Sequence, residues 1–137
     1  MSYAGDVSPE DAYAALQDDA DAVLVDVRTA AEWAYVGLPD LSGLGKQVVT
    51  IEWQSFPSGA HNGAFLGQLR DCGIAQDTPL YFLCRSGVRS TAAAELASAH
   101  GLGPAYNIRD GFEGPHDRLG HRSVAGWKAA GLPWRQG

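Results

Sequence analysis

The chain has 137 residues, of which 45% are hydrophobic and 19% charged, and its formal net charge is −6. These values are ordinary for a globular protein, and the length predicts a single domain spanning residues 1–137. The chain has no long basic run and no apolar stretch of membrane-spanning length, so we expect no nucleic-acid or membrane partner. Its start lacks the basic and apolar pattern of a secretion signal, which favours a cytoplasmic location.

The predicted elements begin with a helix whose N-cap is Ser8, with Pro9 in the first helical position, and which runs to about Gln17. Residues 22–27 form a short, nearly continuous apolar run, as expected of a strand buried on both faces. The sequence T-A-A-E at residues 29–32 has the spacing of a capping box and predicts a short helix to about residue 35.

The remaining predicted elements alternate between strands and helices. In chain order they are a loop at 37–45, a strand at 47–53, a loop at 54–60, a helix at 62–71, a strand at 79–83, a helix at 90–100, a strand at 105–108 and a helix at 124–130. This alternation predicts an α/β fold with an open, mostly parallel sheet flanked by helices on both faces. In such sheets, ligands bind beyond the carboxyl ends of the strands.

The segment most informative about function follows the strand at 79–83. Cys84 ends that strand, where it faces the positive end of the next helix dipole and a run of free backbone N–H groups. Arg85 and Arg89 add two positive charges, and all these influences favour the thiolate, which is the nucleophilic form of cysteine. A buried core cysteine is the alternative, but it would not require two arginines and a glycine directly after it.

The loop after Cys84 has the composition of an anion cradle. Gly87 permits a tight backbone turn, and the backbone N–H groups of the loop can then point inward. The loop consists of Arg85, Ser86, Gly87, Val88 and Arg89. An acidic chain with a locally cationic loop indicates a small anionic ligand. At the end of the strand at 22–27, Asp26 and Arg28 are expected to give structural support by hydrogen-bonding a neighbouring loop, or to form an ion pair or cap such as Arg28 with Glu32.

The sequence resembles the single-domain rhodaneses. The resemblance rests on L-V-D-V-R at residues 24–28, A-E-W at 31–33, C-R-S-G-V-R at 84–89, D-G-F-E-G at 110–114 and G-W-K-A-A-G-L-P-W at 126–134. It implies a sulfurtransferase in which Cys84 takes the outer sulfur of thiosulfate or a similar donor, releases sulfite and carries a persulfide. Cyanide, a thiol or a protein would then accept the sulfur. The site predicted in this way comprises Cys84, the loop at 85–89, and Asp26, Arg28 and Ser90 in support.

Two other functions are weighed against this one. Tyrosine phosphatase-like and arsenate reductase-like enzymes place an arginine six positions after the cysteine, whereas here that position is Ser90 and the arginine comes one residue earlier. A partner-dependent sulfur carrier or regulatory module is the alternative from another class. No nucleotide-binding motif is present and the histidines have no metal-ligand spacing with Cys84, so we expect no cofactor and no metal.

Some features are less typical of the resemblance. Residues 36–40 read V-G-L-P-D where many members have G-H-I-P-G-A. Trp53, Phe56 and the segment 117–122 are predicted to shape the mouth of the site, with Arg118, His121 and Arg122 able to meet an anionic donor or to lie in a solvated loop. Cys72 is interpreted as a semi-buried filler residue, with a resolving cysteine as the minority view.

Overall fold

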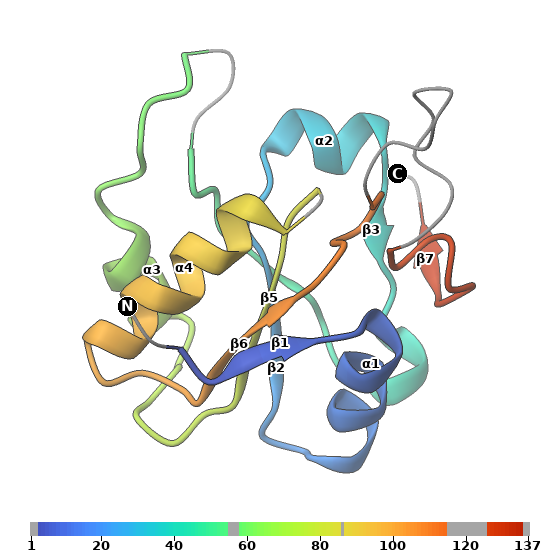
Figure 1. The fold of residues 1–137 in the computed structure, drawn as a ribbon, viewed down its shortest axis with the longest axis horizontal. Helices are drawn as coiled ribbons and strands as arrows, with labels where there is room; N and C mark the ends of the chain where they lie inside the picture. The colour runs from blue at the N-terminus through green and yellow to red at the C-terminus, as the bar shows by residue number, and fades with distance from the viewer. Residues whose placement is uncertain (1–2, 55–57, 86, 115–125, 136–137) are drawn as a thin grey trace.

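The computed structural model describes residues 3–54, 58–85, 87–114 and 126–135 of the chain (Figure 1). Its centre is a parallel sheet of five strands in the order β1-β6-β5-β2-β4. These strands are β1 (Gly5–Val7), β6 (Ala105–Ile108), β5 (Leu80–Leu83), β2 (Val23–Asp26) and β4 (Val49–Thr50). A smaller antiparallel pair joins β3 (Leu38–Pro39) to β7 (Trp134–Arg135).

Helices cover both faces of this sheet, which confirms the predicted fold class. On one face lie α3 (Phe65–Asp71) and α4 (Val88–Ala99), and on the other lies α1 (Pro9–Asp18) (Figure 1). The short α2 (Ala30–Tyr35) follows the carboxyl end of β2. Successive β5 side chains alternate between the two layers of core, because Phe82 packs with α3 and α4 while Leu83 packs with α1.

Local capping explains where the first two helices begin. The backbone N–H of Asp11 donates to the Ser8 hydroxyl over 3.0 Å, as predicted for this N-cap. At α2 the reciprocal capping box is complete, since Thr29 accepts from the Glu32 N–H and the Glu32 carboxylate accepts from the Thr29 N–H. Because these signals are local, the sequence located both helices correctly.

Other predicted boundaries were wrong. The strand expected at 47–53 is reduced to β4, although the N–H groups of Ile51 and Trp53 still bond to the carbonyls of Asp26, the last residue of β2, and Val27. The helix expected from residue 62 begins at Phe65, because the Asn62 side chain accepts from the Ala64 N–H and forms a turn instead. The loop expected at 37–45 contains β3 and a 3₁₀ turn, η1 (Ser42–Leu44).

The helix expected at 124–130 is absent from its described part, which consists of turns. Gly126 has a φ of 101°, and the N–H groups of Trp127 and Lys128 donate to carbonyls of Gly111 and Phe112 rather than into a helix. Trp127 is fully buried by this arrangement. Among the residues described, none of the helices is long and apolar enough to cross a membrane.

Candidate active site

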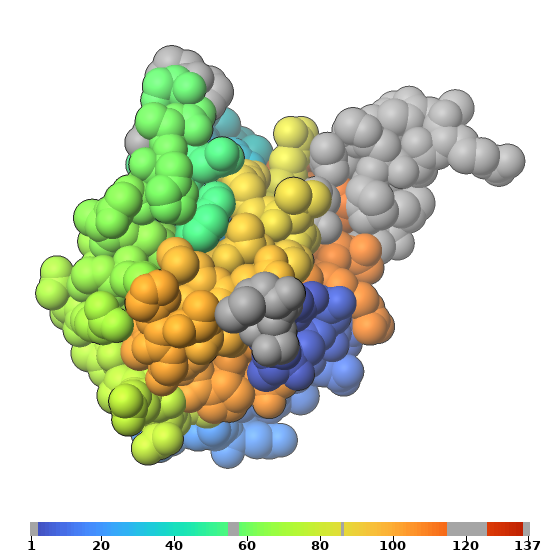
Figure 2. Space-filling model, turned by 60° about the vertical axis from the view of Figure 1, so that its left-hand side comes forward, coloured from blue at the N-terminus to red at the C-terminus, as the bar shows by residue number. Residues whose placement is uncertain are grey.

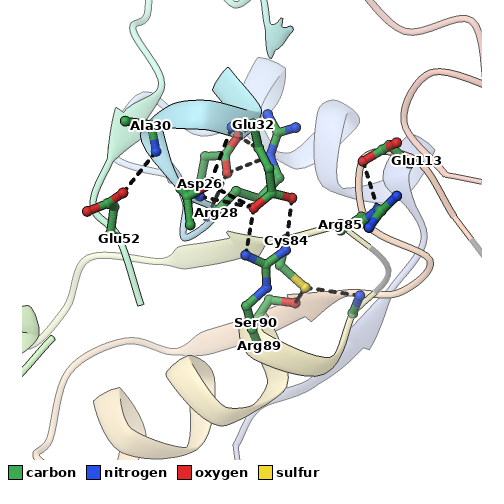
Figure 3. A network of polar contacts seen from close by, with 12 residues as sticks. Asp26, Arg28, Ala30, Glu32, Glu52, Cys84, Arg85, Arg89, Ser90 and Glu113 are labelled. Atoms are coloured by element: carbon green, nitrogen blue, oxygen red, sulfur yellow. Dashed lines mark hydrogen bonds and ion pairs between the residues drawn. The ribbon is translucent and has the colours of Figure 1, made fainter. Parts of the chain in front are cut away.

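Cys84 lies directly beyond the carboxyl end of β5, between the ends of its sheet neighbours β2 and β6. The alternation along β5 turns its side chain toward the α4 side of the sheet, where it joins the core and is only 1% exposed. Figure 3 shows its sulfur at the centre of a set of polar side chains from several elements. This is the edge of a parallel sheet at which ligands bind.

The loop after Cys84 turns back toward the sulfur. The Gly87 N–H donates to the Cys84 Sγ over 3.1 Å, and the Ser90 hydroxyl lies 3.2 Å from the same atom (Figure 3). Gly87 has a φ of 115°, a conformation that disfavours any side chain, and it caps the start of α4. Of the other predicted loop residues, Val88 is 78% exposed and Ser86 lies outside the described residues.

The D-G-F-E-G segment at 110–114 holds the backbone of this loop. The Phe112 N–H donates to the Cys84 carbonyl over 2.8 Å, and the Glu113 N–H donates to the Arg85 carbonyl over 3.0 Å. A Cβ atom on Gly111 would lie 2.4 Å from the Cys84 carbonyl oxygen, so only glycine allows this approach. The segment therefore fixes the position of the cysteine through main-chain contacts.

Arg89 does not present a free guanidinium to the site. It forms a bidentate ion pair with Glu32 of α2, with nitrogen–oxygen distances of 2.8 and 3.0 Å (Figure 3). Burial of Glu32 opposes its ionisation, but the hydrogen bonds and charge of Arg89 and the Thr29 N–H outweigh burial, so the pKa of Glu32 lies below its ordinary value. The role of Arg89 in donor binding stays a prediction.

Arg85 also has a carboxylate partner. Its Nε lies 3.1 Å from an oxygen of Glu113, but the Arg85 side chain is 48% exposed (Figure 3). The Glu113 side chain is only 15% exposed and its Oε2 makes no hydrogen bond, so the ion pair is open to solvent on the arginine side. Arg85 is thus better placed than Arg89 to meet a charged ligand.

Asp26 and Arg28 form a fully buried ion pair at the carboxyl end of β2. The Asp26 carboxylate accepts from the Arg28 Nε over 2.9 Å and from its Nη2 over 2.7 Å, and Nη2 also donates to the Gly37 carbonyl. The guanidinium lies 4.3 Å from the centroid of the Phe112 ring. The pairing of Arg28 with Glu32 suggested by spacing was wrong, because Glu32 faces Arg89 instead.

Cys72 is exposed, so its interpretation as a semi-buried filler was wrong. It caps the end of α3, from which the chain passes to the amino end of β5 at Leu80, whereas Cys84 lies beyond the carboxyl end. This opposite placement disfavours a resolving role. His61 contacts Trp53, His100 contacts a main-chain carbonyl of its own helix, and the described ranges contain no cluster suited to a metal ion.

Trp53 borders a shallow apolar groove beside α4. The groove has a volume of about 470 Å³ and is open to solvent (Figure 2). Its lining residues are Trp53, His61, Ala92, Glu95, Leu96 and Ala99. Phe56 and the segment 117–122, also predicted to shape the mouth of the site, lie outside the described residues.

Two polar residues near the site were missed from the sequence. Asn107 of β6 is 4% exposed and receives a hydrogen bond from the Ser90 hydroxyl, and its own amide donates to Asp6 of β1. The signal that was available is the asparagine within the strand A-Y-N-I, since a polar side chain in a buried strand requires a partner. β1 itself was also missed, because three residues are too few to show a period.

Comparison with known proteins identifies the family. Residues 4–137 match the family model described as the STR4 middle domain. The chain is 34% identical over 128 residues to "Rhodanese-like domain-containing protein 4, chloroplastic" from Arabidopsis thaliana, a match that covers 93% of this chain and 25% of that protein. The chain belongs to the rhodanese-like family.

Other members match over most of their length. The uncharacterized protein RC0915 of Rickettsia conorii is 40% identical over 124 residues, covering 90% of this chain and 91% of that protein. A protein named sulfurtransferase from Allochromatium vinosum is 28% identical over 118 residues, a match that covers 86% of this chain and 82% of that protein. The protein in the crystal structure of Rv0390 from M. tuberculosis is 57% identical in sequence, and the two structures superpose with a TM-score of 0.92 over 99% of this chain and 100% of that one. At the level of the family, the rhodanese-like relative from Arabidopsis thaliana and the protein named sulfurtransferase support sulfur transfer.

Proposed function

We propose that this rhodanese-like protein moves a sulfane sulfur from thiosulfate or a similar donor to a thiophilic acceptor, through a persulfide on Cys84. The observation that carries the proposal is the Gly87 N–H aimed at the Cys84 sulfur over 3.1 Å, at the carboxyl end of a central parallel strand. A main-chain donor in this position stabilises the negative charge of the thiolate, both before the sulfur is taken up and when the charge returns to Sγ as the sulfur leaves.

The proposed reaction has two steps. The Cys84 thiolate attacks the outer sulfur of thiosulfate, a bond forms between the two sulfur atoms, and the bond to sulfite breaks as sulfite leaves with its electron pair. Cyanide or a thiolate then attacks the outer sulfur of the persulfide, and the electrons of the cleaved bond return to Cys84 as thiolate. Because Cys84 is 1% exposed, a donor reaches it with a terminal sulfur atom rather than with a bulky group.

Ion pairs give the site a rigid frame for these steps. Arg89 with Glu32 joins α4 to α2, and Arg28 with Asp26 fixes the end of β2 beside the loop. We assign donor attraction to the half-exposed Arg85 and charge stabilisation to the loop N–H groups.

The decisive experiment is an intact-mass measurement after incubation with thiosulfate, with Cys84→Ser as the matched control and Cys72→Ser to remove the exposed thiol. The proposal predicts a gain of one sulfur atom that depends on Cys84 and is reversed by cyanide. No gain, together with hydrolysis of an aryl phosphate, would favour the phosphatase alternative. If thiosulfate adds no mass and the aryl phosphate is not hydrolysed, but a persulfide compound loads Cys84 with sulfur, then a persulfide replaces thiosulfate as the proposed donor.

The exposed Val88 supports a second candidate acceptor, a protein. Val88 is 78% exposed directly after Gly87, and an apolar side chain beside a reactive group suits contact with a protein surface. In this case Cys84 would load readily from small donors but would release sulfur slowly to cyanide. Comparing loading and unloading rates on the same protein distinguishes the two acceptors.

A further inference from the structure

A chain of polar contacts runs from Cys84 across the sheet to its edge strand. The Ser90 hydroxyl is placed to donate either to the Cys84 sulfur, over 3.2 Å, or to the Asn107 amide oxygen, and the Asn107 Nδ2 donates to Asp6 over 3.0 Å. Tyr3 donates its hydroxyl to the same Asp6 oxygen over 2.7 Å. Ser90 and Asn107 are buried, and Asp6 is exposed. The proposed sulfur chemistry alone gives no reason for this chain beyond Ser90.

The direction of each hydrogen follows from the outer end of the chain. Hydrogen bonds from Tyr3 and then from Asn107 hold the pKa of Asp6 below its ordinary value, so Asp6 is a carboxylate that only accepts at neutral pH. The Asn107 amide must therefore turn its NH₂ group to Asp6 and its oxygen to Ser90. Since that oxygen carries no hydrogen, the Ser90 hydroxyl donates to Asn107.

This leaves Ser90 facing Cys84 with lone pairs, because a serine hydroxyl has a single hydrogen. A protonated Cys84 completes the chain by donating its S–H to the Ser90 oxygen. A thiolate receives a hydrogen from Ser90 only if the hydroxyl rotates, and the buried Asn107 oxygen then loses its donor. The chain therefore fits the thiol better than the thiolate.

We propose that Asn107, oriented by Asp6, is a positioning residue that draws the Ser90 hydrogen away from Cys84 and so restrains formation of the thiolate. The inference rests on the proposed role of Cys84 as the nucleophile. In the loaded state, rotation of the Ser90 hydroxyl toward sulfur would add a second donor to the one supplied by Gly87.

In the described part of the chain, six charged side chains near Cys84 form three ion pairs with one another. They come from the end of β2, from α2, from the loop after β5, from the start of α4 and from the segment after β6. The pairs are Arg28 with Asp26, Arg89 with Glu32, and Arg85 with Glu113. Substitutions at Asn107 and Asp6 leave all three intact, so their effects report on the polar chain.

The test is a pH titration of Cys84, followed by the ultraviolet absorbance of the thiolate in a Cys72→Ser background, with a Cys84→Ser blank. Asn107→Leu should lower the midpoint of the titration by about half to one pH unit, the size of one net hydrogen bond. Adding Ser90→Ala to Asn107→Leu should abolish this shift, because no hydroxyl is left to donate.

A matched pair at the exposed Asp6 separates orientation from charge. Asp6→Asn removes the charge but keeps an acceptor for the Asn107 amide, so the midpoint should stay near that of the parent. Asp6→Leu removes the acceptor and lets the amide turn, so the midpoint should fall as in Asn107→Leu. Equal shifts in both Asp6 variants would overturn the proposal in favour of a simple charge effect.

An unchanged or raised midpoint in a folded Asn107→Leu protein would also overturn it. Circular dichroism establishes folding, and if Asn107→Leu does not fold, the Asp6 pair decides alone. The titration needs no sulfur donor. A protein that shows the predicted shifts but takes no sulfur from any donor would keep this inference and refute the proposed function.

Discussion

Replacing Arg28 by methionine should remove much of the stability of the protein. The Asp26 carboxylate is fully buried and accepts from the Arg28 Nε, its Nη2 and its backbone N–H, of which only the last survives the substitution. Leaving a buried charge without its partner costs about 3–5 kcal/mol. Because a domain of this size is stable by only about 5–15 kcal/mol, the midpoint of thermal unfolding should fall by roughly 10–20 °C.

Urea unfolding at pH 7, followed by tryptophan fluorescence, measures this loss. The exposed Arg70→Met on α3 is the matched control and should change the free energy of unfolding by less than about 0.5 kcal/mol. The double variant Asp26→Leu with Arg28→Met removes both charges and should be more stable than Arg28→Met alone. A loss below about 1 kcal/mol for Arg28→Met, or a double variant less stable than the single one, would refute the reasoning.

Three further predictions concern the loop and its ion pairs. Glu113→Gln should free Arg85 and lower the KM for thiosulfate about two- to fivefold, as measured by steady-state kinetics, and a raised KM would contradict this. Gly87→Ala meets no atom closer than 3.7 Å, so it should fold with a loss of about 1–3 kcal/mol from its positive φ but load sulfur more slowly, whereas Gly111→Ala should not fold. The pKa of Glu32 is lowered by folding, so its carboxylate stabilises the protein above its ordinary pKa of 4.5, and this contribution is lost as the pH falls through the folded value. Glu32→Gln should accordingly be less stable by about 1 kcal/mol at pH 7, and its stability should converge with that of the parent as the pH falls below the lowered pKa of Glu32.

Features that depend on neighbouring residues were predictable from the sequence. The N-cap at Ser8 and the capping box at Thr29 each need only a few consecutive residues to form, and the structure has both. The turn at Gly87 belongs to the same class, because its positive φ follows from the absence of a side chain. The last predicted helix failed for the opposite reason, since its N–H groups bond to a segment brought close only by the fold.

The ion-pair partners could not be predicted, because they are distant in sequence. Arg89 and Glu32 are 57 residues apart, and the spacing rule for helices instead suggested Arg28 as the partner of Glu32. Asn107 reaches Asp6 across 101 residues. The charges of the residues next to Cys84 in sequence therefore predicted a cationic loop. In the structure, carboxylates from other elements pair with its two arginines.

In the proposed reaction, this pairing changes what draws a donor to Cys84. With Arg89 held by Glu32 and Arg28 held by Asp26, the described part of the site has little unbalanced positive charge, and attraction of an anion depends on main-chain N–H groups and on Arg85. N–H groups stabilise the single charge of a persulfide as well as they stabilise one end of a dianion. Thiosulfate is therefore attracted more strongly than a singly charged persulfide donor only to the extent that Arg85 gives up its ion pair with Glu113 and binds the donor instead. The ratio of kcat/KM for these two donors, and its change in Glu113→Gln, thus measures how much of the donor preference rests on the ion pair between Arg85 and Glu113.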